Sequence, residues 1–117
     1  MDRREYYSKE AEIFKALAHP CRLYLLNLLR SHEIQVCEMA RETGRRQPYI
    51  SQHLAMLRSA GLVHARREGA CVYYCLADAR VGELVDLCAA LAACLKGDEQ
   101  PALVVPDDED EWLPEAG

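Results

Sequence analysis

Apolar residues recur at helical spacing along most of the chain. From Ser8 onward they fall three and four positions apart, until the pair His19–Pro20 interrupts the pattern. Proline is tolerated in the first turn of a helix, so Pro20 can open a second, leucine-rich helix. Gly44 can adopt a positive φ and would end a short third helix. The pattern predicts helices that start at Ser8 and Pro20 and others over roughly 34–43, 47–60 and 79–96, the last closed by Gly97.

The predicted helix 47–60 has two unlike faces. Ile50, Leu54 and Leu57 follow one another at i, i+4 and i+7 and line a single apolar face. Small and polar residues occupy the opposite face, and the segment Gly-Arg-Arg precedes the helix. This pattern is typical of a helix that meets a polar, anionic surface. The residues of the opposite face are Pro48, Gln52, Ala55 and Ser59.

The period changes from helical to alternating after this helix. In the segment 62–76, Val72, Tyr74 and Leu76 fall on one face of a strand, and Cys71, Tyr73 and Cys75 fall on the other. The four residues Arg-Glu-Gly-Ala between the two halves are a turn signal, so the pattern predicts a two-stranded hairpin.

The order of these elements predicts a mainly α fold with a small β-hairpin, the winged helix-turn-helix. The apolar stripes of the first and last helices are wider than one small domain would cover. Val81, Leu84, Cys88, Leu91 and Leu95 belong to the stripe of the last helix, so Cys88 is expected to be a core residue. We therefore expect a homodimer that forms through the first and last helices.

Charge divides the chain of 117 residues into two parts. All 14 Lys and Arg residues lie in residues 1–97 with 11 acids, which gives +3, whereas residues 98–117 hold eight acids and no base, which gives −8. We expect residues 1–97 to be a winged helix-turn-helix DNA-binding and dimerisation domain, and residues 98–117 to be an acidic, disordered tail. A tail that competes with DNA for the basic face is the less favoured interpretation.

Apolar runs and cysteines indicate the compartment. No apolar run approaches 18 residues, and the charged N-terminus lacks the apolar stretch of a signal peptide. These features predict a cytoplasmic protein with no membrane partner. In a reducing cytoplasm the six cysteines are expected to be free thiols, metal ligands or redox sensors rather than disulfides.

A basic segment surrounds the predicted helix 47–60. Six arginines and only one acid, Glu42, lie between Arg41 and Arg67, and arginine gains affinity by neutralising DNA phosphates. The N-terminal residues of such a helix read base edges in the major groove, whereas His53 is expected to be a hydrogen-bonded framework residue. We predict double-stranded DNA as the partner. The predicted base contacts are Gln47, Tyr49, Ser51 and Gln52, and the predicted phosphate or minor-groove contacts are Arg45, Arg46, Arg66 and Arg67.

Three segments resemble the ArsR/SmtB repressors, over residues 11–95. They are "FKALAHPCRLYLLNLL", "QPYISQHLAMLRSAGLV" and "RREGACVYYCLAD". The resemblance implies bacterial winged-helix homodimers that bind an imperfect palindrome and leave DNA when an inducer binds. It also implies a dimer interface made by the first and last helices. Members often cap the recognition helix with Ser or Thr, whereas this chain has Arg46 there, so we expect the cap bond to be lost.

Inducers in this family are often soft metals, metalloids or thiol-reactive species. The segment "EIQVCEM" is similar to the "ELCVCDL" of arsenic and cadmium members, with Cys37 at the second cysteine and Gln35 in place of the first. Zinc members use Asp and His on the last helix, where this chain has Asp86 but no histidine. Persulfide-sensing members pair a cysteine of the second helix with one near the end of the last helix. Cys94 fits the latter position, and Cys21 is the nearest cysteine to the former.

Helix and strand geometry limits which cysteines form a sensor. Cys71 and Cys75 share a strand face but stand about 13 Å apart, too far for a disulfide. Cys88 and Cys94 point in different directions on one helix, so they need a partner protomer to chelate an ion. The helix N-terminus favours a reactive Cys21, although burial is an equal expectation. The candidate metal or redox residues are Cys37, Cys21, Cys88 and Cys94.

The favoured hypothesis is a homodimeric repressor released from its operator when a soft metal or metalloid ion, of the arsenite or cadmium type, binds thiols. One alternative is a repressor that senses thiol oxidation or persulfide. Another is a winged-helix regulator with no small-molecule inducer, controlled by its level or by a protein partner. The chain has no nucleophile–base pair and no phosphate loop, so we do not expect an enzyme.

Overall fold

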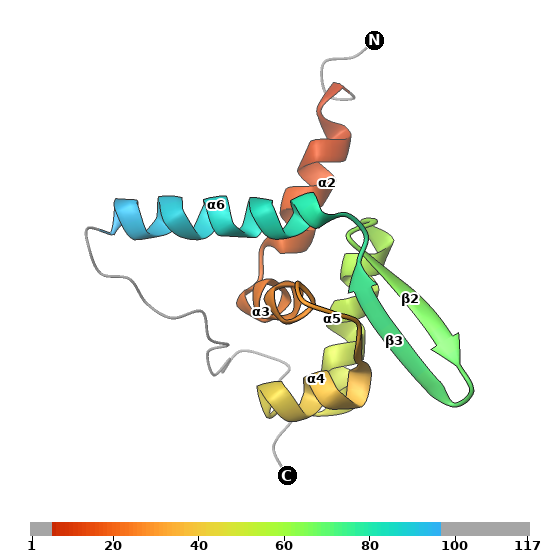
Figure 1. The fold of residues 1–117 in the computed structure, drawn as a ribbon. Coiled ribbons are helices and arrows are strands. Elements are labelled where there is room, and N and C mark those ends of the chain that lie inside the picture. The colour runs from red at the N-terminus through yellow and green to blue at the C-terminus, as the bar shows by residue number, and fades with distance from the viewer. Residues whose placement is uncertain (1–5, 97–117) are drawn as a thin grey trace.

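The computed structural model describes residues 6–96, and Figure 1 shows its helices with a small sheet at one side of them. The predicted tail 98–117 and Gly97 lie outside the described residues. The elements, in chain order, are α2 (Ser8–Leu17), α3 (Pro20–Leu28), β1 (Ile34–Gln35), α4 (Val36–Thr43), α5 (Gln47–Ser59), β2 (Val63–Glu68), β3 (Cys71–Leu76) and α6 (Ala79–Leu95).

The hydrophobic core lies where α3, α4 and α5 meet. Three residues of α5, Ile50, Leu54 and Leu57, are fully buried, together with Leu25 and Leu26 of α3 and Met39 of α4. The helical spacing of these residues puts them on the inner faces of their helices, where packing excludes water. The predicted apolar face of α5 is therefore confirmed, and its burial turns Gln52, Ala55 and Ser59 outward.

Most predicted helix boundaries agree with the structure. Pro20 stands in the first turn of α3, and α5 begins at Gln47 as expected. Gly44 ends α4 in the left-handed conformation, with φ of 73°, which a residue with a Cβ rarely adopts. His19 and Asp78 cap α3 and α6 with their side chains. Local sequence signals therefore set these helix ends.

The sheet differs from the predicted two-stranded hairpin. It has three antiparallel strands in the order β1-β3-β2, and Ile34 and Gln35 pair with Tyr74 and Tyr73 of β3. The expected third helix consequently begins at Val36, two residues later than predicted. Two residues are too few to show an alternating pattern in the sequence. This edge strand is recognised only from its pairing with β3.

An apolar surface runs over α2 and α6. Phe14, Leu87, Leu91 and Leu95 are all more than half exposed, and the far end of α6 extends beyond the other elements in Figure 1. Cys88, expected in the core, is exposed because the core covers its stripe only near the start of α6, at Val81, and not at Cys88. None of the helices in this range is long and apolar enough to cross a lipid bilayer.

The burial of α5 predicts a large loss of stability from one truncation. Leu54→Ala removes a fully buried side chain and leaves a cavity, so the free energy of unfolding should fall by about 2–5 kcal/mol in urea denaturation. Met56→Ala, on the exposed side of the same helix, is the control and should change it by less than about 0.5 kcal/mol. Equal effects of the two variants would contradict the described packing.

Candidate nucleic-acid interface

The turn between α4 and α5 is held by its own hydrogen bonds. The Thr43 hydroxyl donates to the carbonyl oxygen of Met39 over 2.9 Å and accepts from the backbone N–H of Arg45 over 3.2 Å. The Gly44 N–H donates to the Ala40 carbonyl over 2.9 Å. These bonds satisfy groups at the end of α4 and set the direction in which α5 leaves the turn.

The start of α5 presents polar side chains beside positive charge. Gln47, Ser51 and Gln52 are all exposed, and the first turn of α5 contains no acidic residue. The first N–H groups of a helix carry partial positive charge, which favours an anion such as phosphate. Arg46 is the N-cap and makes no side-chain cap hydrogen bond, which confirms the expected loss of the cap. This end of α5 therefore combines partial positive charge with exposed hydrogen-bonding groups.

Tyr49 does not lie on this surface. Its side chain is 3% exposed, and its ring lies edge-on to the His53 ring with 4.8 Å between centroids. The Arg45 guanidinium lies 5.7 Å from the centroid of the Tyr49 ring, within the range of a cation–π contact. This burial disfavours the predicted contact of Tyr49 with bases, which stays a prediction. At 100° per residue Tyr49 flanks the apolar face of α5, so its side chain can pack into the core.

His53 is the framework residue that the spacing predicted. It is buried, its Nδ1 lies 3.3 Å from Nη1 of Arg22, and its ring contacts that of His19 in a tilted arrangement with 4.4 Å between centroids. A guanidinium only donates, so Nδ1 accepts this hydrogen bond. The Nε of Arg22 also donates to the Ala16 carbonyl over 2.6 Å. Arg22 thus ties the end of α2 to the middle of α5.

The two arginines of the wing, which is the hairpin of β2 and β3, are not equivalent. Arg66 donates to Glu33 over 2.6 and 3.1 Å and to Glu68 over 2.7 Å, and it stacks on Tyr73 at 4.8 Å. These hydrogen bonds raise the pKa of Arg66, and the bond from Arg66 lowers the pKa of Glu33. Arg67 is exposed and has no ion pair within residues 6–96.

Cys21 and Cys94 stand in opposite environments. Cys21 is fully buried at the start of α3, which favours the core interpretation over the reactive one. Its backbone N–H donates to Nδ1 of His19 over 3.0 Å. Cys94 is exposed near the end of α6. A thiol reagent in solution therefore reaches Cys94 but not Cys21 in this conformation.

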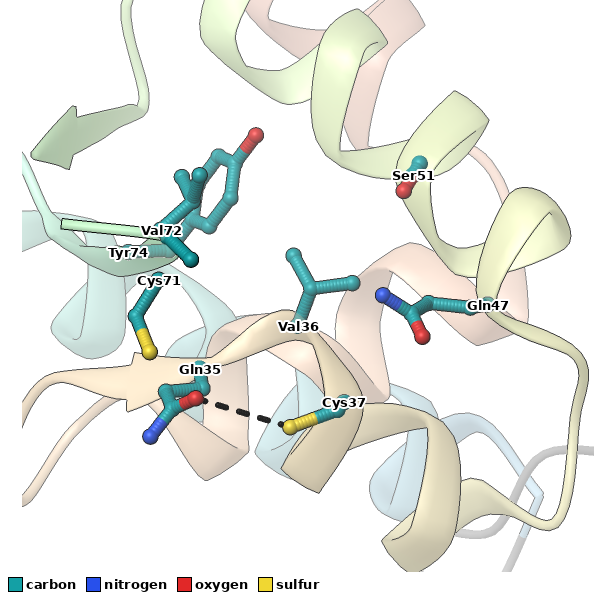
Figure 2. A pocket seen from close by; sticks show the side chains of 9 residues that line it. Gln35, Val36, Cys37, Gln47, Ser51, Cys71, Val72 and Tyr74 are labelled. Atoms are coloured by element: carbon teal, nitrogen blue, oxygen red, sulfur yellow. Dashed lines mark hydrogen bonds between the residues drawn. The ribbon is translucent and has the colours of Figure 1, made fainter. Parts of the chain in front are cut away.

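Cys37 is exposed and lines a cleft between α4, α5 and the wing. Its thiol donates to Oε1 of Gln35 over 3.5 Å, so the residue that replaces the family's first cysteine contacts the second. The cleft has a volume of about 410 Å³ (Figure 2). Cys71 also lines this cleft, although it is remote from Cys37 in the sequence. The lining includes Gln35, Cys37, Gln47, Ser51, Cys71 and Val72.

Comparisons with known proteins agree with this geometry. Residues 19–65 match the model of the "Bacterial regulatory protein, arsR family". An HTH-type transcriptional regulator of Methanocaldococcus jannaschii is 45% identical over 84 residues, which cover 71% of this chain and 94% of the relative. The chain belongs to the ArsR family. Its members are transcriptional regulators rather than enzymes, as the sequence predicted.

Further relatives and solved structures agree over most of the domain. A Streptomyces lividans protein named "Probable mercury resistance operon repressor" is 41% identical, with 80% of this chain and 71% of the relative covered. The solution structure of a homodimeric winged helix-turn-helix DNA-binding domain from Mycobacterium bovis is similar, with a TM-score of 0.73 and 34% identity. It covers 87% of this chain and 96% of that domain. The winged helix-turn-helix prediction is therefore confirmed.

The uncapped start of α5 predicts a stabilising substitution. Arg46→Ser supplies a hydroxyl that can accept from the N–H groups of the first turn, so it should be more stable than Arg46→Ala by about 1 kcal/mol. Both variants remove the same charge, so their difference in urea denaturation isolates the cap. Equal stabilities would show that the start of α5 gains nothing from a capping side chain.

Proposed function

We propose that this chain is a homodimeric repressor that binds a double-stranded DNA operator through α5 and the wing, and that a soft metal or metalloid ion bound by thiols releases it. The observation that carries the proposal is the start of α5, where exposed Gln47, Ser51 and Gln52 adjoin Arg45 and Arg46. Glutamine can bond adenine with two hydrogen bonds, and serine can bond several bases.

The arginines near the predicted DNA surface have different proposed roles. Arg46 and Arg67 are exposed and suited to phosphate contacts, which give affinity without sequence information. Arg66 is already bound by two carboxylates, so its role is to hold the wing against Glu33. Arg45 packs over Tyr49 and supports the turn as well as adding positive charge.

The exposed apolar surface supports a homodimer. An apolar cleft of about 400 Å³ lies between α2, α3 and α6, and Phe14, Leu84 and Cys88 line it. Leu87, Leu91 and Leu95 continue this surface along α6. A second copy would bury these side chains and set two α5 helices about 34 Å apart, the spacing of successive major grooves. The Mycobacterium bovis domain with the same fold is homodimeric.

Thiol ligation has more support than the oxidative alternative. The persulfide pattern needs two cysteines that react together, but Cys21 is fully buried. Soft ions favour thiolate ligands, and the Streptomyces relative is named for mercury resistance. The coupling between ion and DNA binding is expected to be about 1–3 kcal/mol, or roughly 5–150-fold in affinity.

Operator binding can be tested by fluorescence anisotropy with DNA from the promoter of its own gene. Arg46→Ala should weaken binding to every sequence and lower the slope of log affinity against log salt by about one for each protomer. Gln52→Ala should instead cost about 1–3 kcal/mol on the operator and relax its sequence preference, with an unchanged slope.

Arg58→Ala is the matched control for charge. Arg58 is exposed in the last turn of α5, about 18 Å along the axis from Arg46, at the end that points away from the predicted groove. Its removal should change affinity and salt slope much less than Arg46→Ala. A larger effect of Arg58→Ala would contradict the proposed orientation of α5.

The dimer surface has its own test. Leu91→Glu puts a charge in the middle of the apolar surface of α6, so it should give a monomer in analytical ultracentrifugation and lose operator binding. Ala90→Glu adds the same charge about 100° round the helix, on exposed surface outside the stripe, and should stay dimeric. A dimeric Leu91→Glu variant would rule out this interface.

A further inference from the structure

Two cysteines from separate elements line the cleft between α4 and the wing. In the antiparallel pairing of β1 with β3, Ile34 is opposite Tyr74 and Gln35 is opposite Tyr73. Each further step along the first chain is a step back along the second, so Cys37 and Cys71 occupy the positions two steps beyond the last pair. The strand pairing ends there, because the chain enters α4 at Val36. A cleft lies where the next residues of the two strands would otherwise pair.

Gln35 lines the same cleft as the two thiols. Figure 2 shows Gln35, Cys37 and Cys71 among the residues of this lining. Gln35 accepts from Cys37 through Oε1 and donates to the Tyr73 hydroxyl through Nε2 over 3.4 Å. Cys37 is exposed and Cys71 is half-buried, so an ion from solvent can reach both.

We propose that Cys37 and Cys71 form a two-thiol site for a soft cation that favours linear, two-coordinate thiolate ligation, the chemistry of Hg²⁺ and Cu⁺. Soft thiolates select such ions. Residues 6–96 contain no group of three or more His, Cys, Asp or Glu side chains arranged for a metal, which disfavours tetrahedral zinc and three-thiolate arsenic within one protomer. Gln35 adds a neutral oxygen rather than a third charge.

The binding step is an exchange of protons for the ion. Each thiol loses one proton to solvent, and two metal–sulfur bonds form with no change of oxidation state. The hydrogen bond from Cys37 to Gln35 breaks, because its proton has left. Metal–thiolate bonds are about 2.3 Å in zinc sites, so two sulfurs on opposite sides of one ion of that size stand roughly 4.6 Å apart.

Such an ion would act on the DNA-facing surface. Gln47 and Ser51, proposed to contact bases, line the same cleft. Cys71 is paired with Glu68, the neighbour of Arg67, so a bond to Cys71 pulls on the strand pair that carries Arg67. The site thus joins α4 to the wing and changes the spacing between the wing and α5. This step rests on the proposed function, whereas ion binding itself does not.

Ion binding is tested without DNA. In the full chain, Cys75→Ser, Cys88→Ser and Cys94→Ser together leave Cys37, Cys71 and the buried Cys21. This variant is titrated with Hg²⁺ against competing glutathione, and thiolate-to-metal absorbance and native mass spectrometry are recorded. We expect one ion per protomer. Adding Cys37→Ser or Cys71→Ser should weaken binding by about 100-fold or more, because the second bond gains from a high effective concentration.

A matched control keeps the number of thiols constant. A variant that retains Cys75 in place of Cys71 holds its strand thiol about 13 Å further along β3, so it should bind as weakly as the single-thiol variants. Equal affinity with Cys75, full binding without Cys37 or Cys71, or one ion per two protomers would overturn the proposal. So would a Cys37–Cys71 disulfide that forms in air in place of ion binding.

Operator release separates the two proposals. If the chain binds its promoter DNA, one equivalent of Hg²⁺ should weaken that binding by roughly 5-fold or more, a coupling of about 1 kcal/mol, and the loss should vanish in Cys37→Ser and Cys71→Ser. If the chain binds no DNA, the proposed function fails while the titration still decides the site. A release that persists in both serine variants would assign the sensor to other residues.

Discussion

Burial of one face of α5 is the constraint from which the rest of the interface follows. Ile50, Leu54 and Leu57 pack into the core and fix the rotation of the helix about its axis. A helix turns 100° per residue, so this rotation decides that Gln52 points outward and that Tyr49 does not. The contacts of His53 with Arg22 and His19 extend the same constraint to α2 and α3.

The arginines of this surface play different parts in the structure. Arg22 donates hydrogen bonds to Ala16 and His53. Arg66 donates hydrogen bonds to Glu33 and Glu68. Arg46 and Arg67 stand exposed at the start of α5 and on the wing. A basic segment in a sequence is thus partly a scaffold and partly a binding surface.

The wing brings together residues that the chain keeps apart. Glu33 precedes α4, yet it binds Arg66 of β2, and the two residues of β1 pair with β3. These contacts hold the hairpin beside α4 and place Cys71 on the same cleft as Cys37. The cleft therefore holds a pair of thiols, one from the helix-turn-helix and the other from the wing.

The sequence alone determined the winged helix-turn-helix, the helix ends at Pro20 and Gly44, and the outward position of Gln52, because periodicity and turn chemistry are local. Tertiary structure alone decided the edge strand Ile34–Gln35, the burial of Tyr49 and Cys21, the exposure of Cys88 within one protomer, and the ion pairs of Arg66. Each of these depends on a neighbour distant in sequence. A side chain at the border of a helical face is buried or exposed according to what packs beside it, and no spacing rule contains that information.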